Sequence, residues 1–392
     1  MTKANRPIYL DYHATTPVDP RVVDAMLPFF TEYFGNPSST THQYGWEAEA
    51  AVKQARSLIA EGLNATPEEI VFTSGATEAN NLAIKGVAEA YFNQGRHIVT
   101  VQTEHSAVLD PCAYLETLGF EVTYLPANSD GLIDLVQLER SLRADTILVS
   151  VMTANNEIGV LQPLAAIGQL CRDRGILFHT DAAQAIGKIP LDVQAQCIDL
   201  LSLTGHKIYG PKGIGALYVR RRQPRVKLAP QLHGGGHERG MRSGTLYTPQ
   251  IVGLGKALEL AWAEQATEQK RLKQLRDRLW HSLADLPGIH RNGHPTQRLA
   301  NNLNISIEGI DGNALLLGLK NVVAVSSGAA CSSTKTAPSH VLKALGHSDT
   351  FAYASLRFGL GRFNTADEID QAAQSCRETV LALQGKSEVG VG

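Results

Sequence analysis

The chain has 392 residues, of which 43% are hydrophobic and 19% are charged, as is usual for globular proteins. Single cores stop growing near about 250–300 residues, so two packed domains are expected. The formal net charge of −2 gives no reason to expect a nucleic acid or a membrane surface as partner. No apolar run approaches the ~18 residues of a membrane span, and we expect a cytoplasmic protein.

From about residue 70 to 220, short β-branched runs alternate with amphipathic helical segments. Helices are predicted at 79–94, 107–118 and 164–174, and strands at 69–72, 97–102, 121–125, 146–152, 176–180, 199–203 and 215–219. Several of the strands are apolar on both faces, as in parallel strands covered by helices on each side. The pattern predicts an α/β domain with a mostly parallel, seven-stranded sheet sandwiched by helices.

A long helix is predicted from Thr248-Pro249, because threonine is a good N-cap and proline suits the first turn. An apolar stripe continues at helical spacing until Leu286-Pro-Gly288 ends it. Strands near 302–307 and 322–326 then indicate a smaller α+β domain. Residues 385–392 are predicted to form a disordered tail.

The five cysteines contain no C-x-x-C pair, so neither a disulfide framework nor a zinc site is indicated. Cys112, Cys171, Cys197 and Cys376 have apolar or helical neighbours and are predicted to be small core residues. Cys331 instead follows Ser326-Ser-Gly-Ala-Ala330, a run of small residues with little to bury.

Polar side chains follow five of the predicted strands. In parallel sheets, ligands bind beyond the carboxyl ends of the strands, where these groups would meet. The groups are Thr73-Ser-Gly-Ala-Thr-Glu78, Thr103-Glu-His105, Thr153-Ala-Asn-Asn156, Asp181 with Gln184, and Thr204-Gly-His-Lys207.

Ser74-Gly75-Ala76-Thr77 has the composition of an anion-binding helix start, although an ordinary N-cap is an equally good interpretation. It matches neither the nucleoside-triphosphate nor the dinucleotide motif, which favours a single phosphate.

Asp181 follows an apolar strand and should be partly desolvated, so it needs a cationic partner or several hydrogen bonds. That partner could be a structural salt bridge or a protonated pyridine nitrogen. Lys207 could simply extend to water, but Gly205 and Gly210 suggest a chain bent closely around something. A phosphate loop, a buried acid and a lysine of lowered pKa together fit pyridoxal 5′-phosphate (PLP), bound to Lys207 as a Schiff base.

At this point the match becomes specific, since ordered motifs cover nearly the whole chain. The sequence resembles class V, fold-type I PLP enzymes, and within them the cysteine desulfurases of the bacterial iron–sulfur-cluster and nitrogen-fixation type. The motifs are Tyr9-Leu-Asp-Tyr12, Ala14-Thr-Thr-Pro17, Phe34-Gly-Asn-Pro-Ser-Ser39, the five groups above, Asn155-Asn-Glu-Ile-Gly159, Gly205-His-Lys-Ile-Tyr-Gly-Pro-Lys-Gly213, Gly234–Thr245, Ser326–Cys331 and Gly361-Arg-Phe363.

The resemblance implies a role for each site residue. Lys207 would carry the cofactor and take the α-proton, Asp181 would pair with the pyridine nitrogen, and His105 would stack on the ring and assist proton transfer. The ring's phenolic oxygen would be bound by Gln184 and by Asn156, and the substrate carboxylate by Arg357 and again by Asn156. The phosphate would be held by Gly75, Ala76, Thr77, Thr204, His206 and, from the partner subunit of a homodimer, Thr245.

Cys331 matches the sulfur-accepting cysteine of the family. The implied reaction converts L-cysteine to L-alanine, with the sulfur left on Cys331 as a persulfide that a mobile loop could carry to an acceptor. An iron–sulfur scaffold is one possible acceptor, although the chain lacks the longer aromatic-containing tail of relatives that dock such scaffolds. The implied domains are 16–258, which binds the cofactor, and 1–15 with 259–392, which carries Cys331.

Other readings remain open at the level of sequence. An aminotransferase would not need Cys331, and selenocysteine or cystine lyases share the fold. A relative without cofactor could serve as a scaffold protein, but Lys207, Asp181 and Thr77 are all present. The chain departs from the family pattern at His13, where a smaller residue or Asn is usual, at Ala183 before Gln184, and at Ala329-Ala330.

Overall fold

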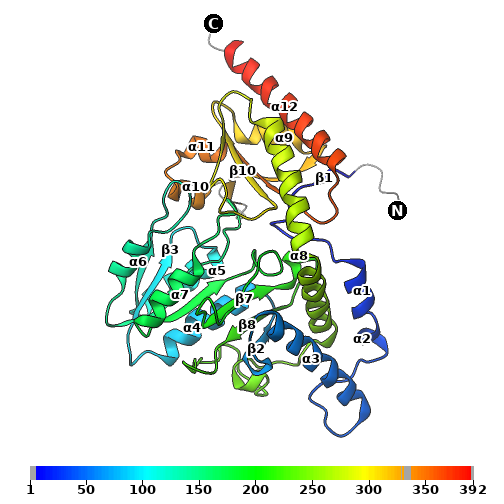
Figure 1. Cartoon of the computed structure of the whole chain (residues 1–392), viewed down its shortest axis with the longest axis vertical. Coiled ribbons are helices and arrows are strands. Elements are labelled where there is room, and N and C mark those ends of the chain that lie inside the picture. Colours follow the sequence, from blue (N-terminus) through cyan, green and yellow to red (C-terminus); the bar gives the residue numbers. More distant parts are fainter. Residues whose placement is uncertain (1–5, 328, 331–336, 390–392) are drawn as a thin grey trace.

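The computed structural model describes residues 6–327, 329–330 and 337–389. One body surrounds a large sheet, a second contains a smaller sheet, and the long helix α8 (Thr248–Leu283) runs between them (Figure 1). Within the described ranges, no helix is long and apolar enough to cross a membrane.

The large sheet has seven strands, as predicted. β8 runs antiparallel to both neighbours and the other pairings are parallel. The strand order is β2 (Ile70–Thr73), β8 (Gly215–Val219), β7 (Leu200–Thr204), β6 (Leu177–Asp181), β5 (Thr146–Ser150), β3 (His97–Val101) and β4 (Glu121–Leu125).

Alternating side chains of the sheet enter two different cores, because successive residues of a strand point to opposite faces. Val71 and Leu217 belong to one apolar cluster, whereas Phe72 and Tyr218 belong to the other. The helices around the sheet are α1 (Pro20–Met26), α2 (Pro28–Thr31), α3 (Gln43–Gly62), α4 (Ala76–Ala90), α5 (Ser106–Thr117), α6 (Leu135–Ser141) and α7 (Leu164–Asp173), with short 3₁₀ turns η1 (Pro67–Glu69), η2 (Gly205–Lys207) and η3 (Glu238–Gly240). All strands except the edge strand β4 are therefore buried on both faces, which explains the nearly continuous apolar runs in the sequence.

Two histidines, His97 and His179, are fully buried inside the sheet. His179 on β6 bridges hydroxyl groups of the neighbouring strands, with Nδ1 2.8 Å from Ser150 Oγ and Nε2 3.0 Å from Ser202 Oγ. Burial lowers the pKa of His179 to about 3, so the ring is neutral.

The smaller sheet is antiparallel, in the order β12 (Ser326–Ser327), β15 (Ser355–Gly359), β10 (Asn302–Ile307) and β9 (Ile289–Arg291). The N-terminal strand β1 (Ile8–Tyr9) pairs in parallel with β11 (Val323–Ala324), so the strand predicted at 322–326 is split in two. The remaining elements are α9 (Gly312–Leu319), β13 (Ala329–Ala330), β14 (Ala337–Pro338), α10 (His340–Ala344), α11 (Asp349–Tyr353) and α12 (Ala366–Val389).

The predicted tail was wrong over most of its length, because α12 continues to Val389. Lys386 and Glu388 are good helix formers, and no proline interrupts the segment, so an established helix can continue by adding one backbone hydrogen bond per residue.

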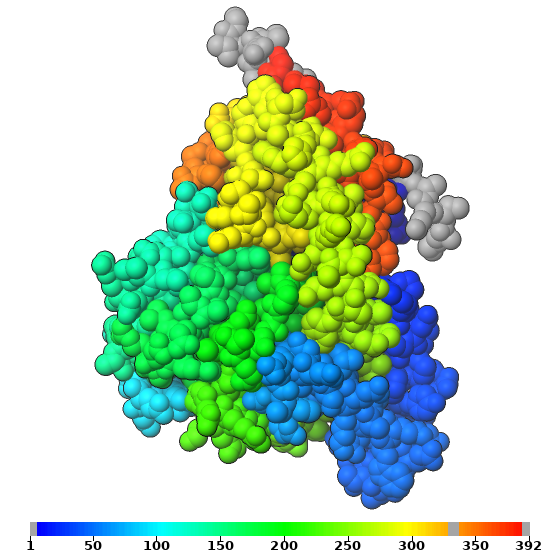
Figure 2. Space-filling view, viewed as in Figure 1, coloured from blue at the N-terminus to red at the C-terminus, as the bar shows by residue number. Residues whose placement is uncertain are grey.

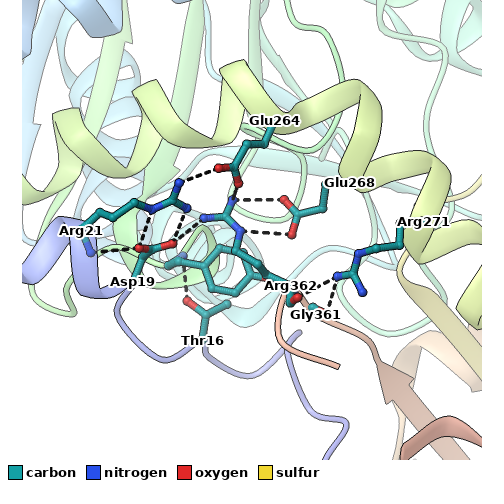
Figure 3. A network of polar contacts seen from close by, with 9 residues as sticks. Thr16, Asp19, Arg21, Glu264, Glu268, Arg271, Gly361 and Arg362 are labelled. Atoms are coloured by element: carbon teal, nitrogen blue, oxygen red, sulfur yellow. Dashed lines mark hydrogen bonds and ion pairs between the residues drawn. The ribbon is translucent and has the colours of Figure 1, made fainter. Parts of the chain in front are cut away.

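A network of charged side chains, the Asp19–Arg362 network, ties three distant segments of the chain together (Figure 3). Arg362 contacts Asp19 at 2.8 Å, Glu268 at 3.1 Å and Glu264 at 3.2 Å, and Arg21 reaches Asp19 and Glu264. Hydrogen bonds from Arg21 and Arg362 lower the pKa of the Asp19 carboxyl group far below its usual value. The network thus joins the N-terminal segment and the segment after β15 to α8.

Candidate active site

A cavity of about 630 Å³ lies at the carboxyl ends of the parallel strands. The five predicted strand ends all contribute to it, as the parallel topology requires. Of the predicted site residues, its lining contains Gly75, Ala76, Thr77, His105, Asn156, Asp181, Gln184, Thr204, His206, Lys207 and Arg357.

Lys207 reaches this cavity from the turn η2, directly after β7. Its Nζ donates to the carbonyl oxygens of His13 and Ala14, the latter at 2.7 Å. Burial, and then the charge of Arg357, lower the pKa of the Lys207 amine to about 8. The neutral, nucleophilic form of the amine is therefore more available near neutral pH than in an ordinary lysine.

The glycines around Lys207 serve the turn itself. A Cβ on Gly205 would lie 2.9 Å from Pro211 O, and one on Gly210 would lie 2.9 Å from Gly205 O. Gly210 N also donates to Gly205 O at 3.0 Å. The chain bends tightly around itself here, which presents the Lys207 side chain to the cavity.

Asp181 ends β6 and is 6% exposed. Its Oδ2 accepts from Asn80 Nδ2 at 2.7 Å, and its Oδ1 accepts from Ala183 N at 2.8 Å. None of the described residues forms an ion pair with Asp181. This buried carboxylate therefore still lacks a positively charged partner. A protonated pyridine nitrogen meets that demand, and the residues therefore fit PLP.

Asn80 was missed by sequence reasoning. It is fully buried, and its Oδ1 has no partner among the described residues. The signal was its spacing, since Asn80 lies three residues after Thr77 and hence on the same face of α4.

The start of α4 forms an anion-binding corner of the cavity. Gly75 is the N-cap with φ +153°, and a Cβ on Gly215 would lie 2.7 Å from Gly75 Cα, so the two backbones approach closely. The first amide groups of the 15-residue helix have no intrahelical acceptors. Thr77, Thr204 and His206 line the same cavity, and the nearby Glu78 is neutralised by Arg242 at 2.7 Å.

His105 caps α5, and its Nδ1 accepts from Ala107 N at 3.0 Å. Because Nδ1 accepts this hydrogen bond, the ring proton of His105 lies on Nε2. The side chain is exposed to the cavity, so its face is free to stack on a flat ligand.

Arg357 on β15 enters the cavity from the smaller sheet. It donates to Asn156 O at 3.1 Å, to Asp11 Oδ1 at 2.9 Å and to Ser326 Oγ at 2.9 Å. In the described part of the chain, its buried Nε has no acceptor and the buried Asn156 Oδ1 has no donor. Unmet polar groups of this kind suit a substrate that carries a carboxylate and an amine.

Two predicted residues do not appear in the cavity lining. Thr245 is exposed on the surface, outside the cavity. Cys331 lies outside the described residues; its nearest described neighbours, β13 and β14, pair with each other across the gap at 331–336.

The other four cysteines are buried, which confirms them as core residues. Burial raises the pKa of the Cys112 and Cys376 thiols to about 12, so neither is a nucleophile at neutral pH.

Two further buried groups, one in the cavity wall and one behind His105, were not assigned roles from the sequence. His13 lines the wall, 1% exposed. Glu104, beside His105, is fully buried, which raises the pKa of its carboxyl group well above the usual value. Its Oε1 accepts from Met152 N at 2.5 Å and so holds the segment after β5.

Comparisons with known proteins agree with this geometry. The aminotransferase class-V family matches residues 8–372. The chain is 58% identical to "Cysteine desulfurase IscS" of Tolumonas auensis, over 97% of this chain and 94% of the relative, and 56% identical to the protein of that name from Shewanella sp. strain W3-18-1, over the same shares.

Solved structures are similar over most of their lengths. A "NifS-like protein" superposes with a TM-score of 0.89 at 38% identity, covering 96% of this chain and all of that one. "SspA in complex with cysteine" gives 0.82 at 40% identity, covering 91% of this chain and all of that one.

Proposed function

This chain belongs to the aminotransferase class-V family, and we infer from its cavity how it acts as a cysteine desulfurase. The protein is a PLP-dependent enzyme that converts L-cysteine to L-alanine and transfers the sulfur to a cysteine thiol. The observation that supports the residue roles best is Asp181, a buried carboxylate without an ion-pair partner in the described structure, facing Lys207 across one cavity.

Each part of the cofactor has a matching group. We propose that Lys207 holds it covalently through its amine, that Asp181 pairs with the ring nitrogen, and that Gln184 and Asn156 bind the ring oxygen. The phosphate would lie at the start of α4 against Thr77, Thr204 and His206, with Thr245 added by a second subunit. When bound, PLP withdraws electrons from the substrate α-carbon and so makes its proton acidic.

The chain's own groups position the substrate and move its protons. Arg357 binds the substrate carboxylate, for which its unpaired Nε–H is available. The Lys207 amine, once displaced by the substrate amine, takes the α-proton and returns it during formation of alanine. His105 covers the ring and donates through Nε2.

Sulfur transfer is assigned to Cys331. Its thiolate forms a bond to the substrate sulfur while the carbon–sulfur bond breaks, and the electron pair of that bond stays with the substrate carbon, which is then protonated. Cys331 is left as a persulfide, and a second thiol can later take the sulfur.

We further propose a homodimer. Phe30 and Tyr247 contact each other with ring centroids 6.3 Å apart, as do Phe34 and Tyr44 at 5.4 Å, although these rings are 46–63% exposed. The N-terminal segment that carries most of them projects at one end of the molecule (Figure 2). A partner subunit would cover this apolar surface, and the nearby exposed Thr245 would reach its cavity.

The domain division proposed is 16–258 for cofactor binding and 1–15 with 259–392 for the Cys331 segment. The protein is proposed to act in the cytoplasm. An iron–sulfur scaffold or another thiol-bearing protein would accept the sulfur.

Incubation with L-cysteine and a reductant tests the function. Wild-type enzyme should release alanine and sulfide in equal amounts, and borohydride should fix the cofactor on Lys207. Cys331→Ala should keep the visible cofactor band but release no sulfide. An enzyme that transaminates cysteine, and does so equally well as Cys331→Ala, would instead be an aminotransferase.

A further inference from the structure

His13 connects the cavity to the smaller sheet through every polar atom of its side chain. Nδ1 lies 3.0 Å from Gln184 Oε1 and Nε2 lies 3.1 Å from Asn302 Nδ2. Its carbonyl oxygen accepts from Lys207 Nζ and, at 2.9 Å, from Gln184 Nε2. One buried residue therefore contacts both Gln184 and the reactive lysine.

Arg298 lies at one end of this series of hydrogen bonds and fixes which group donates in each of them. A guanidinium group can only donate, and Arg298 Nη2 lies 2.7 Å from Asn302 Oδ1. That amide must therefore present its nitrogen elsewhere, and Asn302 Nδ2 donates to Glu157 O at 2.9 Å and to His13. Facing a donor, His13 Nε2 must be the unprotonated nitrogen, and the proton must be on Nδ1.

The other end is fixed by Lys188, four residues after Gln184. Its amine donates to Gln184 Oε1 at 3.3 Å, the same oxygen that accepts from His13 Nδ1. With two donors on Oε1, the Gln184 amide cannot turn over without placing its NH₂ group against both of them. Its nitrogen therefore remains a donor, with one hydrogen on His13 O at 2.9 Å and the second available to a ligand in the cavity that Gln184 lines.

The imidazole must also stay neutral for this arrangement to hold. A proton on Nε2 would oppose the Asn302 NH₂ group in a site where water cannot compensate. Burial is the main cause that lowers the pKa of His13 well below the usual value, and the charged forms of Lys188, Arg357 and Lys207 lower it further.

We propose that Arg298, Asn302 and His13 form an orientation relay, which with Lys188 locks Gln184 as a hydrogen-bond donor toward the ring oxygen of the cofactor. These are positioning residues, and they let the smaller sheet control the cofactor's electronic state. The idea rests on the proposed role of Gln184.

The first test is the tautomer of His13, read from imidazole ¹⁵N shifts of the full-length enzyme and assigned by loss of the signal in His13→Ala. We expect a neutral ring protonated on Nδ1, with shifts constant from about pH 5.5 to 8. An Nε2–H tautomer, or titration with an ordinary midpoint, would overturn the relay.

The second test compares two asparagines of β10. Asn302→Asp places a carboxylate against His13 Nε2, so the ring should move its proton there or become a cation. Asn304→Asp is the matched control, since Asn304 Nδ2 donates to the same Glu157 O, at 3.1 Å, but does not contact His13. Only the first variant should change the ¹⁵N shifts and move the pH midpoint of the visible cofactor band, by about one pH unit.

Equal changes in both aspartate variants would mean that buried charge, rather than the relay, is responsible, and would overturn the proposal. His13→Ala gives a further check, because it keeps the carbonyl contact to Lys207 and should still move the midpoint. If no visible band and no Lys207 adduct exist, the proposed function fails, while the tautomer of His13 still decides the relay.

Discussion

The molecule contains two clusters of charged and polar groups, one partly exposed and one in the cavity, that differ in how many of their polar atoms have partners. In the Asp19–Arg362 network each charge has an oppositely charged partner within 3.2 Å. In the cavity, Asp181 has no ion pair within the described structure, and Arg357 Nε and Asn156 Oδ1 have no hydrogen-bond partners there. The Asp19–Arg362 network, in which every charge is paired, is structural. The unpaired groups of the cavity instead indicate the charges that a bound cofactor and substrate must supply.

Replacing Lys207 should have the largest effect. Lys207→Ala removes both the covalent attachment and the base, so alanine formation should fall at least about 10³-fold. Lys273→Ala, an exposed residue of α8, is the control and should retain full activity. Cysteine turnover assays decide this, and an active Lys207→Ala would refute the assignment.

The two aspartates should then respond in opposite ways. Asp181→Asn should reduce turnover about 10²-fold or more. The free energy of unfolding of the cofactor-free protein should stay equal or rise, because a buried charge without an ion-pair partner is removed. Asp19→Asn should lower that free energy by about 1.5–3 kcal/mol, with turnover of the folded fraction kept. Urea unfolding and turnover should be measured on both variants. If either variant lost turnover and stability together, the contrast between the two aspartates would be refuted.

Acid should separate histidine-dependent from carboxylate-dependent stability. His179 has a folded pKa of about 3 against about 6.5 unfolded, so the unfolded state binds more protons between these values. Stability should therefore fall as pH falls from about 6.5, by about 1.4 kcal/mol per pH unit for this group.

Asp19 contributes to stability over a different, lower pH range. Its folded pKa is depressed, so its contribution is present above the unfolded value of 3.8 and is lost only as pH falls further. Urea unfolding at several pH values from 7 to 4 gives the slope of the free energy of unfolding against pH. This slope should be smaller in His179→Gln than in wild type and unchanged in the exposed His233→Gln. An unchanged slope in His179→Gln would contradict the explanation.

The smallest effect is expected at Asn80. Asn80→Ala removes one hydrogen bond to the Asp181 carboxylate and should weaken cofactor binding about tenfold. Asn81→Ala, on the exposed side of the same helix, should leave it unchanged. Fluorescence titration with PLP would show both.

Much of the site could be predicted because strand ends converge by topology. The residues after β2, β3, β5, β6 and β7 were found from pattern alone, and the cavity contains them. Asn80 and the relay were not found, because a hydrogen-bond partner 101 or 289 positions away leaves no local trace in composition or spacing. The departure at His13 was visible, but its meaning needed Asn302 and Gln184 beside it.

The helix α8 has a mechanical consequence. Its 36 residues span about 54 Å, with Leu254 and Leu258 in the core of the large sheet and Leu275 and Leu279 in that of the smaller one. Because one continuous helix is embedded in both cores, it transmits force between them. Neither core can unfold without exposing the half of α8 that it buries. Pulling on the intact chain should thus unfold both cores in one step.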